Sequence, residues 1–142
     1  MTKYRVTRYL LDTNVISELR KPRPHGAVVA WVSGLRPEQI FLSSVTLGEL
    51  QIGVERVRQH DGQKASEIER WLDAIQASMS VLPMDSACFR EWARLIAGKP
   101  DNLLEDAMIA STARIHGLTV ATRNVRDFAD FMVEVANPFD PL

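Results

Sequence analysis

The sequence contains little cysteine and histidine, and it lacks any long apolar run. Cys88 is the only cysteine in 142 residues, so no disulfide can form within the chain and a reducing cytoplasm is the expected location. The histidines His25, His60 and His116 do not have the spacing of metal ligands. No apolar run approaches the roughly 20 residues that cross a bilayer. A disulfide scaffold, a soft-metal site and a membrane protein are therefore not expected.

A strong charge of one sign is also missing. The 17 lysines and arginines nearly balance the 18 aspartates and glutamates, and the net charge is −1. The overall charge therefore does not indicate a nucleic-acid-binding protein. The basic start from Met1 to Arg8 is not followed by the apolar core of a signal peptide. The length predicts one domain, residues 1–142, that buries about two-thirds of its unfolded surface.

Short apolar runs alternate with amphipathic segments along the chain. The runs at residues 9–11, 40–42, 81–84, 118–122 and 133–135 predict strands. Helices are predicted at about residues 15–19, 25–35, 45–58, 62–78, 86–97 and 103–116, with a short helix within 123–131. This alternation predicts an α/β fold with a mainly parallel sheet that is covered by helices on both faces.

Three acids lie close behind predicted strands. Asp12 follows the first strand, and Thr13 and Asn14 can orient its carboxylate, although any of the three can instead cap the next helix. Glu49 lies in the first turn after the second strand, where Thr46 to Glu49 also fits a capping box. Asp127 follows the fourth strand, and its alternatives are a helix cap or a pair with a neighbouring arginine.

A fourth acid, Asp106, lies near the start of a helix rich in small residues. The segment Asn102 to Glu105 fits a capping box, so the helix does not need Asp106 as its cap. Asp106 shares a helical stripe with Ile109, Ala110 and Ala113. This stripe turns the carboxylate toward the sheet, where it needs a cation or hydrogen-bond donors to stay ionised.

Together the four acids predict an oxygen-only metal site. Converging carboxylates take up protons unless a cation neutralises them, and carboxylates with water prefer Mg²⁺ or Mn²⁺. Such a site suits hydrolysis of a phosphodiester. Groups that can hold waters or phosphate oxygens are Thr13, Asn14, Thr122 and Asn124. Basic residues cluster after the first predicted helix and beside Asp127, and they can hold RNA phosphates or form a solvated surface. They are Arg20, Lys21, Arg23, Arg123 and Arg126.

Four segments resemble the PIN-domain family, and within it the VapC-type ribonuclease toxins of bacterial toxin–antitoxin pairs, especially the FitB-like subgroup. These segments are Leu11 to Glu18, Ser43 to Leu50, Glu105 to Ala113 and Ala121 to Phe128. They occur in the family's order and spacing over nearly the whole chain. The sequence departs from the family pattern at Ser111, where alanine is frequent, and in a longer lead ahead of Tyr9.

The resemblance implies a three-layer α/β/α sandwich with a central, mainly parallel five-stranded sheet. It also implies a Mg²⁺- or Mn²⁺-dependent endoribonuclease that blocks translation by cutting tRNA or rRNA. The family's acidic positions fall on Asp12, Glu49, Asp106 and Asp127, and its polar helper falls on Thr122 or Asn124. Family members usually form homodimers, and an antitoxin of the VapB or FitA kind inserts its C-terminal tail into the site.

Three other classes of protein also use acidic pockets. A receiver-type signalling module needs a lysine after a late strand, and no lysine of this sequence fits that position. A haloacid-dehalogenase-like phosphatase needs a second aspartate two residues after Asp12, where Asn14 stands instead. A catalytically silent module would use the acidic cleft only to dock a basic peptide, and the presence of all four acids disfavours it.

Overall fold

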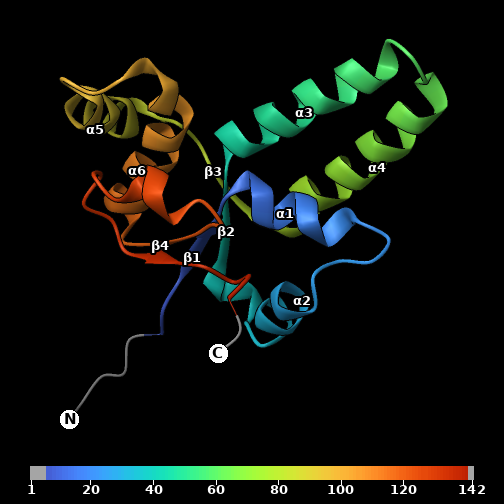
Figure 1. The fold of residues 1–142 in the computed structure, drawn as a ribbon, viewed down its shortest axis with the longest axis horizontal. Coiled ribbons are helices and arrows are strands. Elements are labelled where there is room, and N and C mark those ends of the chain that lie inside the picture. The colour runs from blue at the N-terminus through green and yellow to red at the C-terminus, as the bar shows by residue number, and fades with distance from the viewer. Residues whose placement is uncertain (1–5, 141–142) are drawn as a thin grey trace.

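The structure is a computed structural model that describes residues 6–140 (Figure 1); the first five residues of the lead ahead of Tyr9 lie outside this range. The strands are β1 (Tyr9–Leu11), β2 (Ile40–Ser43), β3 (Ser80–Leu82), β4 (Thr119–Ala121) and β5 (Val135–Ala136). The helices are α1 (Thr13–Arg20), α2 (Gly26–Ser33), α3 (Ser44–Arg58), α4 (Gly62–Ser78), α5 (Ser86–Ile96) and α6 (Leu104–His116). Short 3-10 turns are η1 (Pro37–Gln39), η2 (Asp101–Leu103) and η3 (Val125–Phe128).

The strands form one sheet in the order β3-β2-β1-β4-β5, and each neighbouring pair is parallel. This confirms the predicted five-stranded parallel sheet. Because all strands run in one direction, their carboxyl ends lie at the same edge, and α1, α3 and η3 follow that edge after β1, β2 and β4. The site is therefore expected there.

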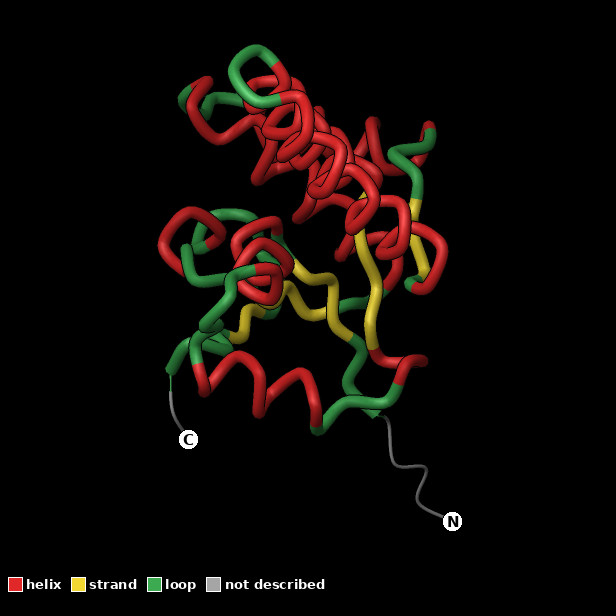
Figure 2. The backbone as a smooth tube through the Cα atoms, turned by 90° about the vertical axis from the view of Figure 1, so that its right-hand side faces the viewer, coloured by secondary structure: helices red, strands yellow, loops and turns green. Residues whose placement is uncertain are grey.

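Side chains of the central strand alternate between two apolar cores. Leu10 packs with residues of α5, α6 and η3, including Leu95, Ile109 and Phe128. Leu11 faces the opposite core, which draws on α1, α2, α3 and α4. Figure 2 shows the strands between helices on both sides, which is the predicted three-layer arrangement. Leu10 and Leu11 are fully buried, so both faces of this strand are covered.

Polar residues set the helix boundaries, and some differ from the predicted caps. Asp85 caps α5 by accepting a hydrogen bond from the Cys88 N–H, as expected, and Gly117 ends α6 with φ of +67°. The two predicted capping boxes are wrong. Ser43 caps α3, because that helix begins directly at the end of β2. No side chain caps α6, because η2 leads straight into it.

The remaining differences are small. The last strand is Val135–Ala136, further along the chain than the predicted 133–135. It pairs only with β4 and lies at the edge of the sheet, where one neighbour fixes its limits. Within residues 6–140, no helix has both the length and the apolar character needed to cross a membrane.

Leu10 tests how far the central strand determines stability. Replacement by alanine leaves a cavity at a fully buried position, and we expect the free energy of unfolding to fall by about 2–5 kcal/mol. The control Ile52→Ala lies at a position that is 53% exposed and should change it by less than about 0.5 kcal/mol. Urea unfolding followed by circular dichroism measures both. Equal effects of the two substitutions would contradict this account of the core.

Candidate active site

Asp12 lies at the carboxyl end of β1 with 5% of its surface exposed. Its carboxylate accepts hydrogen bonds from the Thr122 hydroxyl at 2.8 Å, the Thr13 N–H at 2.8 Å and the Asn14 side-chain amide at 3.1 Å. Burial raises the pKa of Asp12, and these bonds oppose the rise. Asp12 is also the N-cap of α1, so the predicted capping role and a role in the site are both compatible with its position.

Glu49 projects from α3 toward the start of α1. The Thr13 hydroxyl donates a hydrogen bond to its carboxylate at 3.1 Å and lies 3.3 Å from the hydroxyl of the buried Thr46. Glu49 therefore reaches across to α1. The capping-box alternative required it to fold back onto its own helix, and it does not. Burial raises the pKa of the Glu49 carboxyl, the Thr13 bond lowers it, and the nearby charge of Asp12 raises it further.

Residues after β4 complete a hydrogen-bond network around Asp12. The buried Thr122 hydroxyl donates to Asp12 and accepts from the Asn124 N–H at 3.0 Å. Asn14 donates to the Thr122 oxygen at 3.2 Å and accepts from the Arg123 N–H at 3.0 Å. The loops after β1 and β4 are thus joined by side chains, because these strands are neighbours in the sheet.

Asp106 lies in the first turn of α6 and is half-buried. Burial and the negative charges of other acids together raise the pKa of its carboxyl to about 7, with burial the largest cause. The acids are Asp12, Asp127, Glu49 and Glu105. Asp106 is therefore within electrostatic range of the other three acids singled out in the sequence. Asp127 itself lies in η3 and contributes to the raised pKa of Asp12.

The donor chemistry of this edge is that of a hard cation site. Its side chains offer carboxylate, hydroxyl and amide oxygens, which Mg²⁺ and Mn²⁺ prefer. In the part of the chain that the structure describes, no three acidic, histidine or cysteine side chains are close enough to hold a metal ion by themselves. A Mg²⁺ ion usually takes one or two carboxylates and keeps several waters. The residues present fit an ion held in that way.

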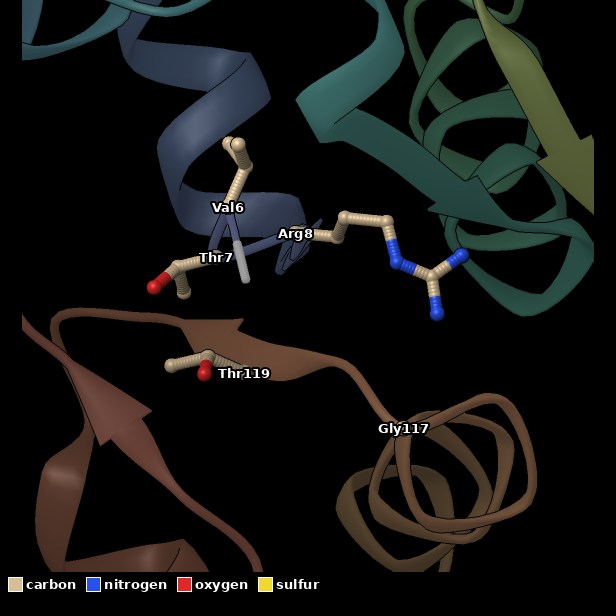
Figure 3. Close-up of a pocket in the computed structure, with 5 residues that line it drawn as sticks. All are labelled: Val6, Thr7, Arg8, Gly117 and Thr119. Carbon is tan, nitrogen blue, oxygen red and sulfur yellow. The ribbon is translucent and has the colours of Figure 1, made fainter. Parts of the chain in front are cut away.

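Not every predicted site residue reaches this edge. Arg20 is exposed at the far end of α1, roughly 10 Å along the helix axis from Thr13. A separate pocket lies at the opposite, amino edge of the sheet, lined by Val6, Thr7, Arg8, Gly117 and Thr119 (Figure 3). There Arg8 donates to the His116 carbonyl at 2.9 Å. The pocket and the four acids therefore lie at opposite edges of the sheet.

Sequence reasoning missed two contributors to this edge. Thr46 stands three residues before Glu49, so it lies on the same face of α3 and meets the Thr13 hydroxyl; this helical spacing could have indicated it. Phe139 is buried, and its ring centroid lies 4.1 Å from the Arg123 guanidinium. No local pattern links these two, because their contact depends on the pairing of β4 with β5.

The fold and the acidic edge define an α/β protein of nuclease type. The chain belongs to the PIN domain family, whose model matches residues 9–132. It is 36% identical over 137 residues to Toxin FitB of Neisseria gonorrhoeae, covering 92% of this chain and 97% of that protein. It is 34% identical over 139 residues to the VapC ribonuclease Y4jK of Sinorhizobium fredii, covering 93% and 98%.

A solved structure supports the same assignment. The crystal structure of FitAcB from Neisseria gonorrhoeae superposes with a TM-score of 0.82 at 37% identity, covering 92% of this chain and 98% of that one. The similarity extends over most of both chains, and it confirms the predicted family and fold.

The raised pKa of Asp106 makes the stability of the metal-free protein depend on pH. Its carboxyl titrates at about 7 in the folded state and at about 4 in the unfolded chain. The folded state then binds more protons between these values, so this group's contribution to the free energy of unfolding falls as the pH rises from about 4 to about 7. Carbon-13 NMR of the carboxyl groups measures the titration midpoint.

Two variants test this shift: one removes a neighbouring charge, and the other removes the titrating group itself. Asp12→Asn removes a repelling charge and should lower the Asp106 midpoint, whereas Asp106→Asn should remove this part of the pH dependence of unfolding. A midpoint below about 5 in the metal-free wild-type protein would contradict the geometry, since it is close to that of an isolated aspartate.

Proposed function

We propose that this protein is a metal-dependent endoribonuclease, the toxin of a toxin–antitoxin pair, that cuts structured RNA such as tRNA or rRNA and so inhibits translation. The observation that carries the proposal is the group of mutually repelling carboxylates at one sheet edge, in a chain related over 92% of its length to Toxin FitB. The name of the related VapC ribonuclease Y4jK supports RNA as the substrate.

We propose Mg²⁺ or Mn²⁺ as the cofactor. One or two carboxylate ligands would come from the set Asp12, Glu49, Asp106 and Asp127, with waters completing the coordination. When bound, such an ion activates water and screens the charge that builds on the scissile phosphate. The repulsion that raises the pKa of Asp106 supports this assignment, because a divalent cation is what relieves it.

The polar residues around the acids act mainly as positioning residues. Thr122 and Asn14 donate to Asp12, and Thr13 donates to Glu49, so each hydroxyl or amide fixes the direction of a carboxylate. The predicted role of Thr13 and Asn14 in holding substrate is therefore secondary to this one. Asn124 and Arg123 are exposed after β4 and are the better placed of the predicted groups to contact RNA.

The acidic edge also suggests how the protein is controlled. A segment carrying an arginine complements converging carboxylates through charge-assisted hydrogen bonds, so we propose that an antitoxin related to VapB or FitA covers the site. We further propose a homodimer that joins the antitoxin in a larger assembly. Its RNA targets would place the activity in the cytoplasm.

Asp12→Asn tests the acidic site directly. Asparagine keeps an oxygen that can cap α1, so we expect the fold to be retained while cleavage of total bacterial RNA falls at least about 100-fold. Gel electrophoresis of the RNA, with antitoxin-free protein and Mn²⁺, measures the loss. The matched control is Asp73→Asn, at an exposed position of α4, which should cleave like the wild type. Full activity of Asp12→Asn would overturn the proposed function.

Metal removal tests the cofactor separately. In excess EDTA we expect cleavage to stop while circular dichroism still reports a folded protein, because the apolar cores do not involve the metal. Excess Mg²⁺ or Mn²⁺ should restore the activity, since both are hard cations that accept carboxylate and water ligands. Cleavage that persists in EDTA would rule out a metal-dependent reaction.

A further inference from the structure

A pocket of about 600 Å³ adjoins the acidic edge. It lies between the segments that follow the paired strands β4 and β5. Its volume is within the roughly 300–1,000 Å³ typical of small-ligand sites. The polar residues that line it are Arg123, Asn124, Arg126, Asp127, Asn137 and Asp140. Asp127 thus belongs both to this pocket and to the acidic set, which places the pocket next to the proposed reaction centre.

One wall of the pocket presents fixed positive charge. The Arg123 guanidinium lies 4.1 Å from the centroid of the buried Phe139 ring, and its backbone N–H is held by Asn14 at 3.0 Å. A guanidinium stacked on an aromatic face keeps its N–H edge available for an anion. Arg126, also exposed, adds a second cation to the lining. Two arginines beside a nuclease centre are suited to an RNA phosphate.

The turn after β5, on which Arg123 packs through Phe139, also lines the pocket and presents a carboxylate. The Phe139 N–H donates to the Asn137 side-chain oxygen at 3.0 Å, and the Asp140 N–H donates to the Asn137 carbonyl at 3.2 Å. These bonds fix the backbone that carries Asp140. Within residues 6–140, the Asp140 carboxylate forms no hydrogen bond or ion pair with the protein. Asp140 is exposed, so its carboxylate lies at the surface of the pocket, where it can accept hydrogen bonds.

This inference rests on the proposed ribonuclease function. We propose that the pocket is a subsite for a guanine nucleotide that flanks the scissile phosphate, with Asp140 reading the base and Arg123 and Arg126 binding phosphate. Bases of unpaired RNA are read on their Watson–Crick edges. Guanine presents two adjacent donors there, N1–H and the N2 amino group, which match the two oxygens of a carboxylate. Adenine, cytosine and uracil each place an acceptor beside the donor, so a carboxylate repels them.

Binding tests the subsite without cleavage. In the Asp12→Asn background, with Mg²⁺ present, a short fluorescein-labelled RNA with a single central guanine should bind about tenfold more tightly than the same RNA with adenine. Fluorescence anisotropy measures both affinities. Adding Asp140→Asn should abolish this preference, because one carboxylate acceptor becomes a donor. Adding Asp130→Asn, an exposed acid outside the pocket, should leave the preference intact.

Cleavage of an RNA with randomised unpaired positions gives the second readout. Sequencing of the product ends should show guanine enriched at one position next to the cut by the wild-type protein, and Asp140→Asn should shift that position toward adenine. If the wild-type protein cleaves without a guanine preference, or if Asp140→Asn keeps the preference, the subsite is wrong while the proposed function stands.

Two further outcomes are decisive. If no RNA is cleaved, the proposed function fails and the subsite beside a scissile phosphate fails with it, even where guanine is bound preferentially through Asp140. If Asp140→Asn weakens binding of the antitoxin while the preference among RNAs is unchanged, the pocket is a peptide site and the guanine proposal is overturned.

Discussion

The constraint on which the site depends is the placement of several acidic side chains at one edge of the parallel sheet, where their charges repel one another. Strands that run in one direction deliver the residues after them to the same side of the sheet, and here these include Asp12 and Asp127, with Glu49 and Asp106 approaching from helices. Burial, and after it the charges of the other acids, raises the pKa of the Asp106 carboxyl to about 7. Separating such groups would stabilise the fold, and the proposed cation would instead offset their repulsion where they stand.

The hydrogen bonds around Asp12 hold its buried carboxylate in place. Three donors, from Thr122, Thr13 and Asn14, oppose the effect of burial on the Asp12 carboxyl, and Thr13 also orients Glu49. These donors come from the start of α1 and from the residue after β4. The apolar cores on the two faces of the sheet hold these elements, so they support the site indirectly. Stability and function are therefore built on the same strands, with the apolar side chains along them and the polar ones at their carboxyl ends.

Much of this fold and site could be predicted from the sequence. The bounds of α4, Gly62–Ser78, agree with the apolar period of that segment, and Asp12 stands at the end of β1 as its short apolar run indicates. The helix caps at Thr46 and Asn102 were wrong, because the choice among nearby polar residues depends on how the chain enters each helix. The contacts of Thr46 with Thr13 and of Arg123 with Phe139 join segments distant in sequence. Such contacts follow from strand order, which local patterns do not encode.

The central claim is that these carboxylates share a divalent cation, and anomalous X-ray scattering from crystals grown with Mn²⁺ tests it most directly. The account predicts an anomalous peak at the carboxyl edge, about 2.0–2.3 Å from a carboxylate oxygen of Asp12, with at least one of the other three acids close by. Well-ordered crystals in saturating Mn²⁺ with no peak at this edge, or with Mn²⁺ only at unrelated surface sites, would contradict it.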